Sequence, residues 1–260
     1  MMSVASWSEW VCFAVTLIFV LFSHEVGFRF GTRRRLKPGE NPEASAGTLS
    51  GTTIGLLAFM LAFTFNGAAT NHHARKDLII DEANAVRTAY QRAMALPAPY
   101  RAEINGLLRE YVDIRVKAPG LRPAERKLAL GRSMAIQGEL WALALVLQQK
   151  QPDVPMVGPF MESLREVFDL HVRRVEAAFQ SRIPSIIWTV LYLLTFITMA
   201  MVGYRIGLTG IRSTFTELSM ALAFSAVLLV IAALDRPDGM MRVSQKPLAD
   251  LLVMFRAGGQ

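Results

Sequence analysis

The sequence has little of what usually marks an enzyme or a nucleic-acid-binding protein. It contains a single cysteine, Cys12, so it cannot form an internal disulfide. No glycine-rich phosphate loop, zinc-finger spacing, nucleophile elbow or kinase signature occurs along its 260 residues. No basic run is interleaved with aromatic residues, as nucleic-acid recognition would favour. We therefore expect no catalytic site, no cofactor, no bound metal and no nucleic-acid partner.

The few polar groups that could carry chemistry have simpler interpretations. The adjacent His72 and His73 would project about 100° apart on a helix, which makes them a poor chelating pair. Arg29 follows Glu25 by four residues, the spacing of an ion pair on one helix face. A membrane enzyme would need a polar cavity around His24 and Glu25, or around Asp81 and Glu82. Ion pairing is the favoured interpretation of both pairs.

Long apolar runs are the dominant feature. A helix needs about 20 mostly apolar residues to cross a bilayer. Four segments satisfy this requirement, at about 10–28, 49–69, 183–202 and 214–234. The first lacks both a positive leader and a small-residue cleavage site, so we expect a retained membrane anchor rather than a signal peptide.

The residues between the second and third spans have a different pattern. Apolar residues recur there at helical spacing, and "APGLRP" and "QPDVP" interrupt them. This predicts an all-α membrane protein with four transmembrane helices and a helical extramembrane region. The expected parts are 1–70 with spans one and two, 71–182 as the extramembrane region, 183–235 with spans three and four, and 236–260 as a C-terminal tail.

The net charge of +7 favours anions or anionic lipid headgroups as partners. Arg33, Arg34, Arg35 and Lys37 lie in the first loop, which the positive-inside rule would place in the cytoplasm. The opposite side is also basic near the membrane, so charge alone leaves the orientation open.

The second span, "LSGTTIGLLAFMLAFTFNGAATNHHARK", has two distinct faces. Its small residues recur at helical spacing and predict a helix-packing face: Gly51, Gly55, Ala58 and Ala62. A second row of bulky residues could meet lipid or could meet symmetry mates in an oligomer: Leu57, Leu61 and Phe65. Polar or ion contacts are expected where the span ends, at Asn66, His72, His73 and Arg75.

The segment "LLAFMLAFTFNGAATNHHARKDLIIDEANAV", the four-span plan and the motif "LDRPDG" resemble a bacterial family of bestrophin-like membrane proteins. That family is similar to the bestrophins, which are pentameric anion channels. The resemblance implies an inner-membrane homo-oligomer with a cytoplasmic middle region. It also implies that the second span lines the pore, with Leu57, Leu61 and Phe65 as an apolar neck.

This chain departs from bestrophins after the neck. It has Asn66 and "NHHARK" where they have an arginine and an aromatic stretch, and no calcium clasp is evident. The expected function is an oligomeric, anion-conducting channel. The alternative is a non-conducting membrane scaffold whose helical middle region binds a protein partner.

Overall fold

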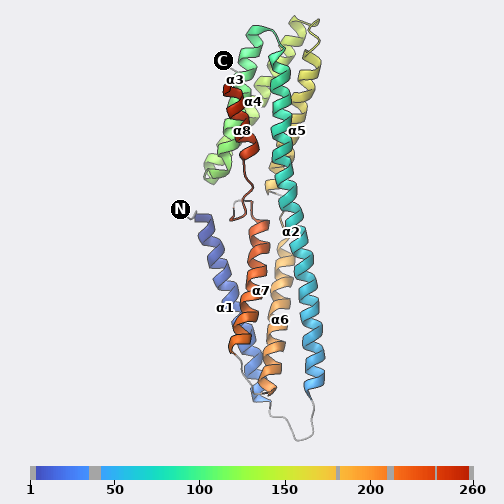
Figure 1. The fold of residues 1–260 in the computed structure, drawn as a ribbon, viewed down its shortest axis with the longest axis vertical. Coiled ribbons are helices and arrows are strands. Elements are labelled where there is room, and N and C mark those ends of the chain that lie inside the picture. Colours follow the sequence, from blue (N-terminus) through green and yellow to red (C-terminus); the bar gives the residue numbers. More distant parts are fainter. Residues whose placement is uncertain (1–3, 35–41, 180–181, 210–213, 238, 258–260) are drawn as a thin grey trace. The chain divides into compact units, whose positions relative to one another are not determined.

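The computed structural model describes residues 4–34, 42–179, 182–209, 214–237 and 239–257. Arg35, Lys37 and Asp238, which belong to the basic loop and the exit motif considered above, lie outside the described residues. The elements in chain order are α1 (Val4–Arg33), α2 (Pro42–Met94), α3 (Ala98–Lys117), the short 3-10 turn η1 (Ala118–Gly120), α4 (Pro123–Lys150), α5 (Val157–Phe179), α6 (Ser185–Thr209), α7 (Thr214–Asp235) and α8 (Lys246–Ala257) (Figure 1). The described residues contain no strand, so the predicted all-α class with four long apolar helices is confirmed.

The chain forms two compact units, each of which is described separately. The first consists of Met1–His72 and Arg182–Arg242, and the second of His73–Ser181 and Val243–Gln260. Helix α2 contributes residues to both. The expected C-terminal tail is divided between them, because its residues to Arg242 belong to the first unit and those from Val243 to the second.

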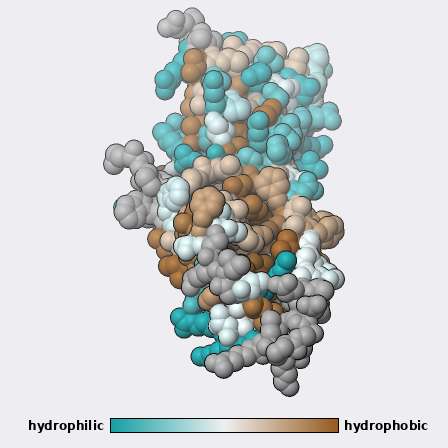
Figure 2. Space-filling view, turned by 60° about the horizontal axis from the view of Figure 1, so that its bottom comes forward, coloured by the Kyte–Doolittle hydropathy of each residue, from teal (hydrophilic) through white to brown (hydrophobic). Residues whose placement is uncertain are grey.

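The first unit holds four helices that are long and apolar enough to cross a membrane: α1, the first part of α2, α6 and α7. Two apolar clusters hold these helices together. One joins Leu57 and Leu61 of α2 to Leu191 of α6 and to Leu228 and Ile231 of α7. The other joins Val20 of α1, Met199 of α6 and Ala221 of α7. Apolar side chains gather over this unit in Figure 2, as expected where lipid is the solvent.

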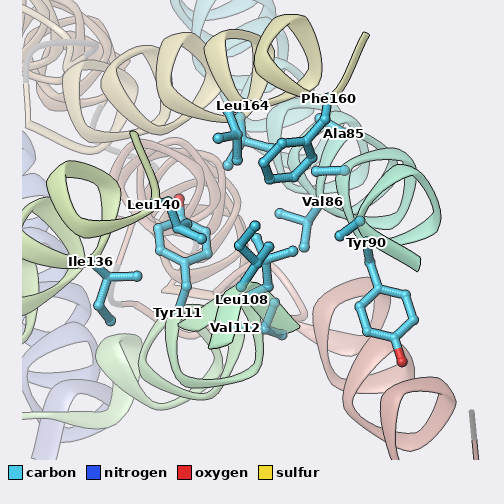
Figure 3. Packing of buried hydrophobic residues seen from close by; sticks show 14 of the residues in the cluster. Ala85, Val86, Tyr90, Leu108, Tyr111, Val112, Ile136, Leu140, Phe160 and Leu164 are labelled. Atoms are coloured by element: carbon cyan, nitrogen blue, oxygen red, sulfur yellow. The ribbon is translucent and has the colours of Figure 1, made fainter. Parts of the chain in front are cut away.

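The second unit is a bundle of the remainder of α2 with α3, α4, α5 and α8. Its core is a single cluster of apolar side chains from all five helices, part of which Figure 3 shows. Helix α4 contributes one narrow seam, formed by Ser133, Ile136, Leu140, Ala144 and Leu147. These residues recur every three or four positions, which places them on one side of the helix. The surface of this unit visible in Figure 2 is mostly hydrophilic.

Helix α8 completes the core of the second unit. Leu248, Leu251 and Phe255 are fully buried and recur at helical spacing. They lie within residues 236–260, for which a C-terminal tail was expected. The Phe255 ring stacks on Tyr90 of α2, with 4.2 Å between the ring centroids. Arg109 of α3 donates a hydrogen bond to the Phe255 carbonyl oxygen. The end of the chain is therefore an integral part of this bundle.

Candidate pore surface and buried charge network

Helix α2 buries one side inside the first unit. Leu57, Leu61, Thr64 and Ala68 are spaced by four, three and four residues, so they lie along one line of the helix. Leu57 and Ala68 are completely buried, and Leu61 is 6% exposed. The Thr64 hydroxyl donates to the Met60 carbonyl at 2.7 Å, which satisfies it within the apolar contact. This side anchors α2 against α6 and α7.

The predicted neck residues differ in burial along α2. Leu57 and Leu61 belong to the buried line, whereas Phe65 is 42% exposed. A side chain buried against its own chain cannot also line a channel between chains, so a neck at Leu57 and Leu61 does not fit this placement. Packing against α6 and α7 uses the same i, i+4 spacing as a pore constriction, so spacing alone does not separate the two uses.

The exposed apolar side of α2 carries a different row. Leu56 is half exposed, and Phe59 and Phe63 are each 66% exposed. Phe59 and Phe63 are four residues apart and therefore project from nearly the same side. The exposed Asn66 follows Phe59 by seven residues, which places it within about 20° of the direction of Phe59.

The predicted small-residue face also lies on the exposed side. Gly51, Gly55, Ala58 and Ala62 are all exposed. A Cβ added at Gly51 or Gly55 would meet no described atom within 4 Å. The face therefore does not pack within the unit, and its use in contact with another chain stays a prediction.

The close helix contact of the first unit lies elsewhere, between α1 and α6. A Cβ added at Gly27 or Gly31 of α1 would come within 3.0 Å of the α6 backbone, and one at Gly203 or Gly207 of α6 would come equally close to α1. Both pairs have the G-x-x-x-G spacing that allows membrane helices to approach closely. This contact was not predicted from the sequence, although the glycine spacing indicates it.

The polar residues that follow the second span lie in different environments. The Nε2 atom of His72 lies 3.0 Å from the Met241 carbonyl oxygen, so His72 holds the segment that follows α7. Asn66 and His73 are exposed, and Arg75 is buried. Among the described residues, no group of three histidine, cysteine or acidic side chains could hold a metal ion.

His24 and Glu25 of α1 each belong to an ionisable pair within the first unit. Arg29 Nε lies 2.7 Å from Glu25 Oε1, so the predicted pairing along α1 is present. His24 instead faces α7, where its Nδ1 lies 3.1 Å from Glu217 Oε1. Both side chains of this second pair are buried, and the partner is 193 positions away in the printed sequence. Local spacing could not have identified it.

A buried network of charges lies in the second unit, centred on Glu82 of α2. Its carboxylate is completely buried and accepts hydrogen bonds from the Tyr111 hydroxyl at 2.6 Å and from Arg115 Nε at 3.0 Å. Arg174 of α5 donates to the second oxygen of Glu82 and also to the side-chain oxygen of Gln245. The network thus joins α2, α3 and α5 to the segment that precedes α8.

The protonation states in this network follow from its geometry. Burial opposes ionisation of Glu82, but the charges of Arg115 and Arg174 and the hydrogen bond from Tyr111 outweigh it and lower the pKa to about 2. Burial and the charge of Glu82 raise the pKa of Tyr111 well above 10, so its hydroxyl remains a donor. Because that proton points to Glu82, the contact of 3.0 Å between the hydroxyl and His171 Nδ1 requires a proton on Nδ1.

Burial and the charge of Arg115 lower the pKa of His171 to about 4, so the imidazole is neutral at pH 7. One carboxylate therefore faces two guanidinium groups, and the network carries one net positive charge. Its fully engaged groups offer no activated nucleophile. The arrangement fixes the relative positions of α2, α3 and α5.

Comparison with known proteins identifies a family by sequence and related folds by structure. A model of the bestrophin-like domain matches residues 14–248, which is most of the chain. The chain belongs to the bestrophin-like family. No curated protein matches it significantly.

Several solved structures share the fold. A single-substitution variant of a bacterial bestrophin homolog from Klebsiella pneumoniae matches with a TM-score of 0.68 and 14% identity, over 100% of both chains. A second variant matches with a TM-score of 0.66 and 12% identity, over 96% of this chain and 98% of that one. The homolog structure phased with zinc matches with a TM-score of 0.60 and 15% identity, over 94% and 98%. The fold is thus shared along the whole chain, although few residues are identical.

Proposed function

We propose that this chain forms an oligomeric ion channel in the bacterial inner membrane and that it conducts anions. Membership of the bestrophin-like family supports the class, and the net charge of +7 favours anions over cations. Its resemblance to bestrophins suggests a ring of five copies with the second unit on the cytoplasmic side. Helix α2 would line the central pore.

The observation that carries this proposal is the exposed row of Phe59 and Phe63 on α2. In a ring of subunits, the side of α2 opposite Leu57 would face the axis, and these two aromatic rings would then form the apolar neck. A ring of large apolar side chains opposes water entry and therefore ion passage. Asn66, which follows in nearly the same direction as Phe59, would present its amide N–H groups to a passing anion.

The adjacent small-residue face fits the same arrangement. Gly51, Gly55, Ala58 and Ala62 lie beside the row of Phe59 and Phe63 and are exposed within the described chain. Small residues allow neighbouring helices to approach closely in a membrane. In the proposed ring, this face would contact the next subunit and bring the aromatic rings near the axis.

Anion flux through liposomes tests the neck. We expect Phe59→Ala and Phe63→Ala to raise chloride efflux, because a smaller side chain lowers the dewetting barrier. Phe22→Ala is the control, since Phe22 is a similarly exposed phenylalanine that lies on α1 instead of α2. Equal flux in all variants and in the wild type would contradict the neck.

Particle symmetry tests the assembly independently. Electron microscopy of the purified protein should show a ring with a central axis. A monomer or a dimer without such an axis would instead favour the non-conducting scaffold.

A further inference from the structure

One end of the first unit carries a cluster of arginines on two helices. Arg33 is the last residue of α1, Arg34 follows it, and Arg205 lies four residues before the end of α6. The Arg34 Nη1 donates a hydrogen bond to the Tyr204 hydroxyl at 3.0 Å, which brings the two helix ends together. Arg33, Arg34 and Arg205 are all exposed. Three exposed arginines therefore lie near the ends of two apolar helices.

The start of α2 adds to this positive region. A Cβ added at Gly47 would lie 3.8 Å from the Arg205 Cζ and 3.9 Å from its Nη2, so the guanidinium rests close to the second turn of α2. The first N–H groups of a helix have no partner within the helix, and the helix dipole places partial positive charge there. Both features add positive potential to the turn of α2 that precedes Gly47.

The arginines are not neutralised by the carboxylates that the structure describes. Arg29 is paired with Glu25, whereas no carboxylate whose side chain the structure describes, a set that excludes Glu40 and Glu43, forms an ion pair with Arg33, Arg34 or Arg205. Guanidinium groups bind phosphate with two parallel hydrogen bonds, which gives both strength and geometry. The cluster is thus suited to a phosphate group.

The apolar surroundings distinguish a lipid from a free anion. Phe30 lies in the last turn of α1, four positions before Arg34, and its side chain is 63% exposed. We propose that Arg34, Arg205 and Tyr204 bind the phosphate of an anionic phospholipid, whose acyl chain lies against Phe30. Arg33 contributes positive charge at the edge of this headgroup site. The proposal does not depend on ion conduction.

The test is native mass spectrometry of the purified full chain with short-chain phosphatidylglycerol and phosphatidylcholine. The wild type should retain phosphatidylglycerol in preference to phosphatidylcholine. Each arginine near a membrane surface strengthens attraction to anionic lipid, so Arg34→Gln with Arg205→Gln should reduce that preference about tenfold or more. Arg87→Gln with Lys127→Gln is the matched control, because it removes two exposed charges from the second unit. That control should keep the preference.

Two further measurements separate a lipid site from a site for free anions. Phe30→Ala leaves the charge unchanged, so it should weaken retention of phosphatidylglycerol. Inorganic phosphate should displace the lipid far less effectively than added phosphatidylglycerol does. The proposal is overturned if the double arginine variant keeps its lipid preference, if the control loses it to the same extent, or if inorganic phosphate competes as well as the lipid.

Discussion

Replacing Glu82 by glutamine should destabilise the second unit strongly. The substitution keeps the shape of the side chain but removes the negative charge that faces both Arg115 and Arg174. Both guanidinium groups are largely buried, so they would oppose each other with no counter-charge from this position. The Tyr111 hydroxyl would also lose its charged acceptor.

Two estimates of the cost agree. Removing one partner of a buried ion pair costs roughly 3–5 kcal/mol, because an uncompensated charge remains inside. The pKa of Glu82 falls from 4.5 to about 2 in the folded chain. At about 1.4 kcal/mol per pKa unit, this corresponds to about 3 kcal/mol of stabilisation at neutral pH. For a chain of this size, a loss of about 3 kcal/mol should lower the melting temperature by roughly 10 °C.

Thermal unfolding in detergent, followed by far-UV circular dichroism at pH 7, measures this effect. Asp81→Asn is the matched control, because Asp81 is the adjacent residue on α2 and its side chain is exposed. The control should melt within about 2 °C of the wild type, since surface substitutions usually change stability by under about 0.5 kcal/mol. If Glu82→Gln melts with the control, the network does not contribute the stability that its geometry indicates.

Three further outcomes follow from the structure. The pKa of His171 is lowered to about 4 in the folded chain, so the unfolded chain binds a proton first as the pH falls from 6.5. Stability should therefore decline between pH 6.5 and 4. His171→Gln should flatten this part of a profile of melting temperature against pH. Gly203→Ala should destabilise the first unit by about 1–3 kcal/mol, because the added Cβ meets the α1 backbone, whereas Gly55→Ala should not lower the melting temperature. Phe255→Ala should cost about 3–5 kcal/mol by opening the core beneath Tyr90, and limited proteolysis should then release the α8 segment faster than from the wild type.

The helices that cross the membrane could be predicted because their signal is local. A run of about 20 apolar residues has few other stable uses. The extent of α2 beyond its span was also predictable in principle. No glycine or proline occurs between Gly67 and Pro97, so nothing in that stretch ends a helix before Met94. Helix α8 was not predicted. Its apolar residues are buried only by packing against Tyr90 and other residues far away in the sequence.

The charge network was beyond prediction for the same reason. Spacing along α2 suggests ion pairs within one helix, yet the partners of Glu82 are Arg115 on α3 and Arg174 on α5. Such partners depend on how the helices pack, which the spacing of residues within one helix does not reveal. The glycine contact between α1 and α6 is an intermediate case. Its spacing is visible in the sequence, but the pairing of these two helices is not.

Helix α2 shows why spacing alone cannot assign a pore. A helix with bulky residues in several rows gives the spacing of every row but not the direction in which each row points. The direction is set by the partner helices, and here Leu191, Leu228 and Ile231 lie where Leu57 and Leu61 can pack against them. Phe59 and Phe63 then remain on the opposite side, beside the small-residue face, whose side chains are too short to cover them. These aromatic rings must be covered by lipid or by other copies of the chain, and the flux and symmetry experiments distinguish the two.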